Sequence, residues 1–404
     1  MRDVIAIRLI VLSLGVALGV FYPFFSVILR ERGFTAGEIG LITSIGAIGF
    51  TVAVPVWGHL ADVRLGRPRT LQICAVGGAL AVAALIAPWP MIAVFVLYTT
   101  FTVFESAWQP LTDAITVNTV RGREYGRVRL LTSLSFAIAT IVAGFLYDRT
   151  GYAPAYLGLA AAALVMAVAA AFVPDVERAD LRTHAGANGI PSAASSPRRT
   201  WRFGSIGVAL RHAPRLAWVL AAVTLLHIGI ISGFTFLGLR ITELGGSPSQ
   251  VALSSGLSAA VEIPALLLAG RVARRIGLRG LFAASALLYG AAMVTWTVLD
   301  VPAAIIATRA MTGVAFAGVI VSVVLTIAEL LPRELQATGQ ALYQTTAFGV
   351  AAVIANAIGG RLYESVGHSA LFGLGAILAL AAAILGWLMF PHRTAGPTRE
   401  LAPG

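Results

Sequence analysis

Three polar side chains recur at four-residue intervals inside an apolar stretch of the chain. Glu105, Gln109 and Asp113 lie between residues 91 and 119, where hydrophobic side chains predominate. In a helix, residues four apart share one face, so these side chains would form one polar stripe. A carboxylate in hydrocarbon is costly unless it is paired, protonated or in contact with water. We therefore expect Glu105 to carry a proton or to contact a solute; a fixed contact to another helix is the alternative.

An isolated acid and an isolated base lie farther along the chain. Glu262 is the only charged residue between Val251 and Gly270, and Arg309 lies in the apolar stretch 302–331. A change in the protonation of such a carboxyl group can couple to a proton gradient. Arginine keeps its charge, so Arg309 must meet a carboxylate, backbone carbonyls or an anionic solute. A pair with Glu262 or Glu105, a substrate anion, and extension to the outer surface all remain open.

Five further polar or aromatic residues are candidates for contact with a solute. Tyr22 and Trp108 could stack on a sugar or an aromatic ring, although packing is the common role of such side chains. Gln340 and Gln344 could line a cavity, or they could hold neighbouring helices together. His227 could titrate near neutral pH or act as a neutral hydrogen-bonding residue.

The composition shows that most of the chain faces lipid. Hydrophobic residues make up 58% of the 404 residues and charged residues 12%, whereas a soluble domain has about 25% charged residues. A helix needs roughly 20 apolar residues to cross a bilayer. The sequence predicts an all-α polytopic membrane protein with twelve spans near 4–29, 37–61, 70–87, 91–119, 129–147, 153–173, 216–239, 250–270, 280–299, 302–331, 335–360 and 369–390.

The distribution of arginine orients these spans. The chain has no lysine, and its net charge of +11 comes from arginine. If both termini are cytoplasmic, most arginines fall in inside segments, and those outside are Arg30, Arg32, Arg149, Arg240 and Arg361. The positive-inside rule therefore predicts a multi-pass protein of the cytoplasmic membrane with both termini in the cytoplasm. No basic segment forms a soluble module, so we do not expect a nucleic-acid partner.

The sequence offers little for catalysis. The single cysteine, Cys74, excludes an internal disulfide and makes a Cys-based metal site improbable. We find no phosphate-binding loop, no HExxH and no nucleophile elbow. We therefore expect no enzyme activity, no cofactor and no metal site.

The chain repeats itself in parallel order. Gly144-Phe-Leu-Tyr-Asp-Arg-Thr-Gly151 returns as Gly360-Arg-Leu-Tyr-Glu-Ser-Val-Gly367, a shift of 216 residues. A segment rich in Pro, Ser, Ala and Arg divides the halves and reads as a flexible linker. The expected domains are a six-helix bundle over 1–173, a cytoplasmic linker over 174–215, a second bundle over 216–391 and a tail over 392–404.

Two parallel six-helix halves joined by an inside loop resemble the major facilitator superfamily of secondary transporters. The most specific local mark is the loop Gly58-His-Leu-Ala-Asp62-Val-Arg64-Leu-Gly66-Arg-Pro-Arg69, against the family pattern Gly-x-Leu-Ala-Asp-Arg-x-Gly-Arg-Arg. One extra residue separates Asp62 from Gly66, which predicts an altered turn. The counterpart after the eighth span has the usual spacing, with Arg274 in place of the acid.

This resemblance implies a conformational gate at the inner loops. In the family, the acid of this loop caps a helix and pairs with arginine, and Asp62 and Arg64 stand at these places here. Arg274 holds the equivalent place in the second half. Near the inner end of the tenth span, Glu329 is expected to form a gate or a helix-end contact, and a role in coupling is the alternative.

Several segments look like the lactose-permease-like group of sugar, nucleoside and phenylpropionate proton symporters. They are Tyr22-Pro-Phe-Phe25, Pro110-Leu-Thr-Asp113 followed by Tyr125-Gly-Arg127-Val-Arg129, and the Gly360–Gly367 loop. In that group an acid of the fourth span pairs with an arginine of the fifth and helps to hold sugar. Asp113 and Arg129 match these positions, at a shorter spacing. A gating pair of Asp113 with Arg127 or Arg129 is the alternative, and the group's coupling His and Glu in the tenth span have no clear match.

The resemblance implies transport by alternating access, powered by an ion gradient. We expect a monomer that carries out proton-coupled symport of a small organic solute, which is a sugar, a nucleoside or an aromatic acid. Sodium is the alternative coupling ion. The alternative function is a proton-driven multidrug efflux antiporter of the same fold. Such exporters carry a Gly-Pro-rich motif in the fifth span, whereas residues 130–147 contain Gly144 and no proline.

Overall fold

The structure, a computed structural model, describes residues 2–119, 123–174 and 203–392. These ranges are helical and contain no strand, which confirms the all-α polytopic prediction. Ten helices in the described residues are long and apolar enough to cross a membrane. One of them, α12 (Pro248–Val298), holds two predicted spans that meet at Gly277. The eighteen-residue α4 (Arg67–Ala84) corresponds to a further span, whose polar first turn lowers its mean hydropathy.

The chain forms two compact units. Unit 1 is Met1–Trp201 together with Ile241–Gly256, and unit 2 is Arg202–Arg240 together with Leu257–Gly404. The linker predicted over 174–215 and the tail predicted over 392–404 lie largely outside the described residues. The domain boundaries inferred from the sequence stay a prediction.

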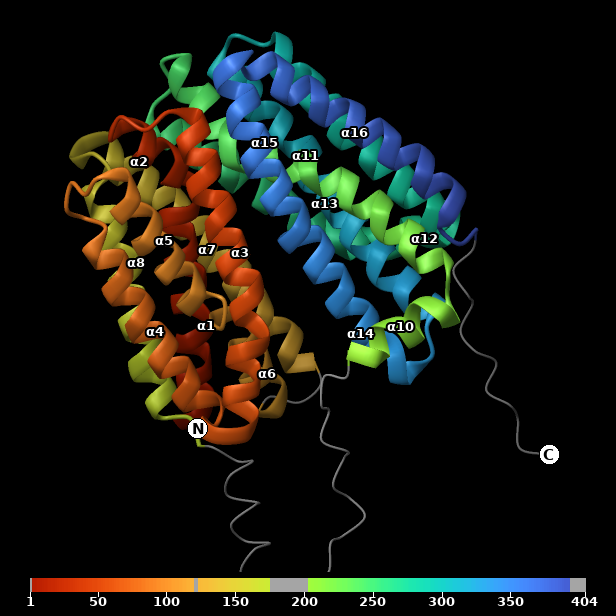
Figure 1. Ribbon diagram of the computed structural model, residues 1–404, viewed down its shortest axis with the longest axis horizontal. Helices are drawn as coiled ribbons and strands as arrows, with labels where there is room; N and C mark the ends of the chain where they lie inside the picture. The colour runs from red at the N-terminus through yellow and green to blue at the C-terminus, as the bar shows by residue number, and fades with distance from the viewer. Residues whose placement is uncertain (1, 120–122, 175–202, 393–404) are drawn as a thin grey trace, which may run out of the picture. The chain divides into compact units, whose positions relative to one another are not determined.

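Unit 1 is built around its first helix. Besides α4, its elements are α1 (Arg2–Phe21), η1 (Tyr22–Phe24), α2 (Phe25–Glu31), α3 (Ala36–Leu60), η2 (Ala61–Leu65), α5 (Met91–Glu105), α6 (Trp108–Thr119), α7 (Arg123–Thr150) and α8 (Ala153–Ala171). Helix α1 packs against α7 and α8, and α3 packs against α5 (Figure 1). Gly15 and Gly19 allow the close approach of α1 to α7, because a Cβ atom at either position would collide with α7. Arg32 donates hydrogen bonds to the carbonyl oxygens of Leu85 and Ala87, which ties the end of α2 to the loop after α4.

The segment Ile241–Gly256 packs with unit 1 although it is distant in sequence. The backbone amide of Ser249, in the first turn of α12, donates a hydrogen bond to Asp148 Oδ1 of α7 at 2.8 Å. One turn earlier on α7, the missing side chain of Gly144 makes room for Ala252. Arg30 and Glu243 approach to 3.9 Å. The ion pair holds this segment against α2, and the backbone hydrogen bond and the close packing at Gly144 hold it against α7.

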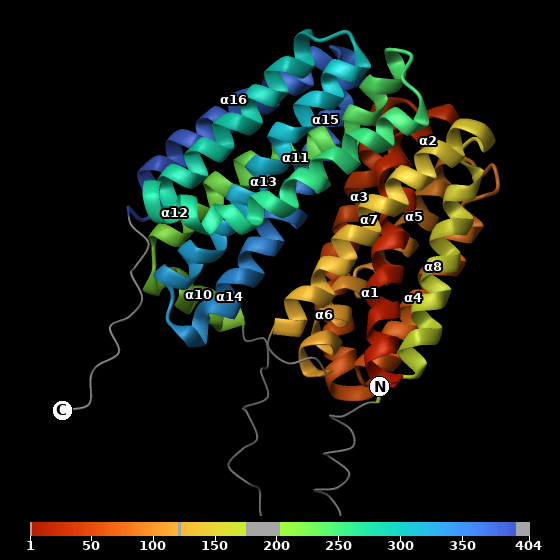
Figure 2. The ribbon, with the colours of Figure 1, turned by 180° about the vertical axis from the view of Figure 1, so that it is seen from behind.

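Unit 2 contains α10 (Phe203–His212), α11 (Arg215–Glu243), α13 (Pro302–Leu330), α14 (Arg333–Gln344), η3 (Thr345–Val350), α15 (Ala351–Ser365), α16 (His368–Met389) and most of α12 (Figure 2). Aromatic rings fix α16 to α12, since Phe282 stacks on Phe390 and Trp296 meets Phe372 edge to face. Gly229 of α11 and Gly375 of α16 let these helices approach closely.

The repeat is visible in the backbone. Within the described residues, the positions with positive φ are all glycines: Gly33, Gly66, Gly151, Gly245, Gly277 and Gly367. They pair in chain order as 33 with 245, 66 with 277 and 151 with 367. Only glycine occupies this left-handed region at low cost. The two halves therefore turn three equivalent corners in the same way.

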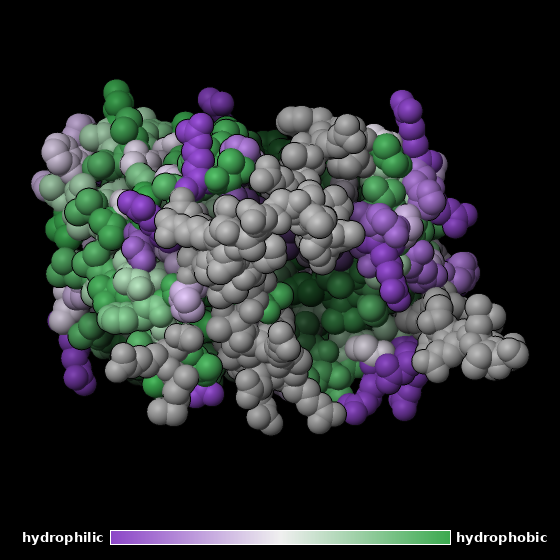
Figure 3. All heavy atoms as spheres, turned by 90° about the horizontal axis from the view of Figure 1, so that it is seen from below, coloured by the Kyte–Doolittle hydropathy of each residue, from purple (hydrophilic) through white to green (hydrophobic). Residues whose placement is uncertain are grey.

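Polar and apolar surfaces separate along the helices. Large hydrophobic side chains are exposed along the spans, for example Leu80, Ile92, Leu267 and Leu388. Seen from below, hydrophilic side chains project at the helix ends beside broad hydrophobic areas (Figure 3). This distribution suits a protein whose flanks meet hydrocarbon.

Candidate functional site

The polar stripe predicted around residue 105 lies on an interrupted helix. Helix α5 ends at Glu105 and α6 begins at Trp108, with a two-residue turn between them. Pro110 is the cause, because it has no N–H group to donate to the carbonyl of Ser106 four residues earlier. The interruption thus precedes the proline in the chain.

The first span is also interrupted, and the two breaks meet. The 3₁₀ turn Tyr22–Phe24 contains Pro23 and separates α1 from α2. The Tyr22 hydroxyl faces the Glu105 carboxylate as a hydrogen-bond donor. Glu105 is 8% exposed, and its Oε2 atom has no hydrogen-bond partner among the described residues. Tyr22, which is half-buried, and the buried Glu105 therefore form one polar pair, and both were predicted from the sequence.

Aromatic rings surround this pair. Phe101 lies with its ring centroid 6.5 Å from that of Tyr22 and 6.0 Å from that of Trp108. Tyr98 stacks on Phe25 at 4.3 Å. Tyr98 and Phe101 were not predicted from the sequence, although they lie seven and four residues before Glu105, a spacing that puts them on its helical face. The carboxyl group thus lies in an aromatic wall of unit 1, which we call the Glu105 cluster: Tyr22, Tyr98, Phe101, Glu105 and Trp108.

Trp108 has a packing role and an unused donor. The side chain is fully buried, and Gly78 of α4 leaves the space that its ring occupies. Its indole Nε1 atom has no partner among the described residues. The next residue, Gln109, donates a hydrogen bond from Nε2 to Asp113 Oδ2 at 3.1 Å, and both side chains are partly buried. Gln109 and Asp113 thus share one face of α6, as predicted.

Glu262 lies on α12 where that helix closely approaches α13. A side chain at Gly313 would collide with the backbone at Ser258 and Glu262, and Ser258 and Thr312 are joined by a hydrogen bond of 3.1 Å. Within the described residues, the half-buried Glu262 carboxylate makes no ion pair and no hydrogen bond. The predicted pair of Glu262 with Arg309 is therefore not formed in this structure.

Arg309 is held by aromatic side chains. It is 6% exposed, and its guanidinium carbon lies 5.8 Å from the centroid of the Trp296 ring. It also donates a hydrogen bond to the Tyr289 hydroxyl. A cation over an indole face is stabilised by the ring quadrupole. The partners left open by the sequence were a carboxylate, backbone carbonyls, an anionic solute or the outer surface. The two aromatic contacts were not among them, because they depend on how separate spans pack.

Span 11 contains a π-helical turn, η3, between α14 and α15. Gln340 is half-buried and Gln344 is exposed, while Tyr343 between them is buried. Such turns are frequent at functional sites. The sequence marked this span as unusually polar, but nothing in it indicated the π-turn.

The predicted gating residues lie at helix ends. Asp62 accepts a hydrogen bond from Arg67 Nε at 3.3 Å, so its observed partner is this arginine. The extra residue of this loop is accommodated by the π-turn η2, which ends before Gly66. Arg64, Arg274 and Glu329 are exposed. The side chains of Arg127 and Arg129 lie outside the described residues.

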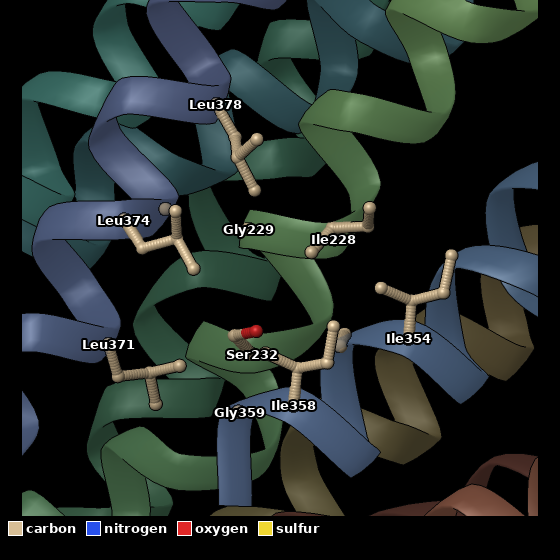
Figure 4. A pocket seen from close by; sticks show the side chains of 11 residues that line it. Ile228, Gly229, Ser232, Ile354, Ile358, Gly359, Leu371, Leu374 and Leu378 are labelled. Carbon is tan, nitrogen blue, oxygen red and sulfur yellow. The ribbon is translucent and has the colours of Figure 1, made fainter. Parts of the chain in front are cut away.

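An apolar cavity of about 210 Å³ lies in unit 2 between α11, α15 and α16. Figure 4 shows leucine and isoleucine side chains from these helices around it, with Ser232 contributing one hydroxyl group. None of the predicted site residues lines it. Its lining suits hydrocarbon rather than a charged or hydrogen-bonding group.

The model of the MFS_1 like family matches residues 12–374. The chain is 29% identical over 390 residues to the maltose permease of Geobacillus stearothermophilus, which covers 94% of this chain and 93% of that protein. It is 25% identical over 382 residues to a probable 3-phenylpropionic acid transporter of Escherichia coli K12, covering 91% of this chain and 93% of the relative. A putative sugar efflux transporter of Deinococcus radiodurans is 25% identical over 391 residues, covering 95% of this chain and 96% of that protein.

The fold matches solved structures of transporters. The crystal structure of a mutant of the nucleoside transporter NupG superposes with a TM-score of 0.77 at 15% identity, covering 95% of this chain and 98% of that chain. At this identity the similarity shows the fold alone. The relatives are transporters rather than enzymes.

Proposed function

Because the chain belongs to the MFS_1 like family and is a multi-pass membrane transporter, we propose that it is a proton-coupled symporter of a small organic solute. It lies in the cytoplasmic membrane with both termini in the cytoplasm, and it works by alternating access. The solute is a sugar, a nucleoside or an aromatic acid.

The observation that carries this proposal is the environment of Glu105. Its carboxyl group is buried in a membrane span, faces one phenol and keeps one oxygen without a partner among the described residues. A buried carboxyl group without a cation is stable when protonated and costly when ionised. Binding and release of a proton there can therefore change the stability of the surrounding structure. Glu262 is the second candidate, because it too lacks a cation among the described residues.

The rings around Glu105 support the proposed solute class. Aromatic side chains with unused donors, such as Trp108 Nε1, favour solutes that combine an apolar face with hydrogen-bonding groups. Sugars, nucleosides and aromatic acids share this character. The printed names of the relatives include maltose, 3-phenylpropionic acid and sugar, and these solutes belong to the classes proposed.

The test is uptake into liposomes. Purified protein is reconstituted, a pH gradient is imposed, and accumulation of radiolabelled maltose, uridine and 3-phenylpropionate is measured. We expect one of these solutes to accumulate with the gradient, and its accumulation to be lost in Glu105→Gln or Glu262→Gln. Glu334→Gln, which changes an exposed acid on α14, is the matched control.

Two outcomes contradict the proposal. Gradient-driven accumulation that persists in both Glu105→Gln and Glu262→Gln would remove these residues from coupling. Extrusion of a cationic drug under the reversed gradient, without uptake of any of the three solutes, would instead indicate the multidrug efflux antiporter. Replacing the pH gradient by a sodium gradient distinguishes the two coupling ions.

A further inference from the structure

Three aromatic rings from two spans meet in unit 2. His227 of α11 is fully buried, and its ring meets Tyr343 edge to face at 5.9 Å and Phe348 at 5.1 Å. Tyr343 and Phe348 also contact each other at 6.0 Å. We call these three residues the His227 cluster.

The π-turn in span 11 builds this cluster. Tyr343 and Phe348 are five residues apart, and on a regular α-helix such residues point in different directions. Tyr343 lies near the end of α14, and Phe348 lies in the π-turn η3 that follows it. The i→i+5 hydrogen bonds of a π-turn widen the spiral, which brings Phe348 round toward the face of Tyr343. Both rings can therefore lie against His227. Phe348 is 37% exposed, so the cluster borders the surface of unit 2.

The hydrogen bonds of His227 fix the role of each ring nitrogen. Nδ1 lies 2.8 Å from the carbonyl oxygen of Val223. A carbonyl only accepts, so Nδ1 carries the proton and donates it. In the neutral ring Nε2 is then an acceptor. This Nε2 atom is buried and has no partner among the described residues.

The second ring of the cluster carries the complementary group. Tyr343 is 3% exposed, and its hydroxyl is likewise buried without a partner among the described residues. A buried polar group without a hydrogen bond costs about 1–3 kcal/mol. His227 Nε2 is an acceptor, and the Tyr343 hydroxyl is a donor on a contacting ring. One partner that both donates and accepts could satisfy both groups.

We propose that His227 and Tyr343 together bind one hydroxyl oxygen. The bound O–H donates to His227 Nε2, and the same oxygen accepts the hydrogen bond of the Tyr343 hydroxyl. A carboxylate is excluded, since it has no proton to give to Nε2. An ammonium group fits less well, since it could donate to Nε2 and to the Tyr343 oxygen but would leave the Tyr343 O–H without an acceptor.

The hydroxyl has two possible sources, a solute and a water molecule. The solute source rests on the proposed function, and it makes this cluster a specificity site for hydroxylated solutes. The water source does not depend on transport. The experiment therefore has one arm that needs no solute, so that failure of the proposed function and failure of this inference are distinguishable.

The first arm measures the ring nitrogen directly. The ¹⁵N resonance of His227 Nε2 is recorded in detergent-solubilised protein and assigned by its absence in His227→Phe. We expect the shift of an Nε2 acceptor that is hydrogen-bonded, and a change of that shift in Tyr343→Phe. Tyr152→Phe is the matched control, since Tyr152 of unit 1 also has a buried hydroxyl without a partner among the described residues. An Nε2 resonance of an unbonded acceptor both without and with added maltose, or one unaffected by Tyr343→Phe, overturns the proposal.

The second arm separates the sources. KM for uptake is measured with maltose, which is rich in hydroxyl groups, and with 3-phenylpropionate, which has none apart from its acid. If the solute supplies the hydroxyl, Tyr343→Phe raises KM for maltose by roughly three- to tenfold and leaves 3-phenylpropionate unchanged. If water supplies it, the resonance of the first arm is the same with and without solute and both KM values move together. Loss of the Nε2 hydrogen bond on adding maltose contradicts both sources.

Discussion

The Asp148 carboxylate accepts a hydrogen bond from the backbone amide of Ser249 at 2.8 Å, in the first turn of α12. Amides of a first helical turn have no partner within their own helix. A carboxylate there meets the positive end of the helix dipole as well as a free N–H group. A side chain of α7 thus performs the capping that a residue of the same helix commonly provides.

Removing this carboxylate should weaken unit 1. We expect Asp148→Ala to lower the free energy of unfolding by about 1 kcal/mol, as loss of a helix cap does, and Asp148→Asn to cost less because its amide oxygen still accepts. The midpoint of thermal unfolding in detergent measures the change. An effect of Asp148→Ala no larger than that of the exposed Glu334→Gln would show that the hydrogen bond contributes nothing.

Gly144 is required by the closeness of α12. An added Cβ would lie 2.3 Å from the Cβ of Ala252. We expect Gly144→Ala to destabilise the protein by roughly 1–3 kcal/mol, the usual cost of overpacking. Gly373 of α16 is the matched control, because an added Cβ there meets nothing within 4 Å. Gly373→Ala should leave stability unchanged or raise it.

A second-site variant sharpens this prediction. Ala252→Gly removes the methyl group against which the new side chain would collide. The double variant Gly144→Ala with Ala252→Gly should therefore recover most of the lost stability in the same unfolding experiment. Additive effects of the two changes would contradict the contact between these positions.

The sequence predicted the spans well because their signal is one-dimensional. The apolar stretches that it placed at 153–173 and 369–390 correspond to helices Ala153–Ala171 and His368–Met389. Length and hydropathy suffice to locate these spans, since a helix in lipid must form its backbone hydrogen bonds within itself. The parallel repeat was equally visible, because glycine at a left-handed corner is rarely replaced.

The site could be predicted only in part. Glu105 and Glu262 stood out because an isolated acid in an apolar stretch is rare. The contact of Arg309 with Trp296 and Tyr289, by contrast, depends on how separate helices pack. The turn after Glu105 and the π-turn before Ala351 are local departures from the helix that hydrophobic patterning does not record. These departures are what place Tyr22 beside Glu105 and Phe348 beside His227.

Tyr22 should matter for transport more than for stability. We expect Tyr22→Phe to keep the aromatic packing against Phe101 and to remove the hydroxyl that donates a hydrogen bond to Glu105. The rate of gradient-driven uptake should fall by about tenfold or less, the value of one hydrogen bond. Tyr147→Phe is the control, since its hydroxyl donates to the carbonyl of Val20. It should lower stability and leave the uptake rate of the folded protein unchanged.

Asp62 should contribute little to stability. Its pair with Arg67 is open to solvent, with 61% of the Asp62 side chain exposed, and such pairs contribute about 0–1 kcal/mol. We expect Asp62→Asn to leave the unfolding midpoint nearly unchanged, while a role in gating would appear as a lower rate of uptake at an unchanged KM. Unfolding of the variant at a clearly lower temperature would instead assign it a structural role.

The spacing of the paired glycines shows that the two halves differ in length by one residue over one interval. Gly33 and Gly66 are 33 residues apart, whereas Gly245 and Gly277 are 32 apart. The first half therefore holds one residue more in this interval, and the interval contains the π-turn η2. A single inserted residue in a helix produces this geometry, because the wider turn leaves the flanking helical register intact. The first half thus carries its additional residue as a π-turn, at a place where the flanking helices need not rotate.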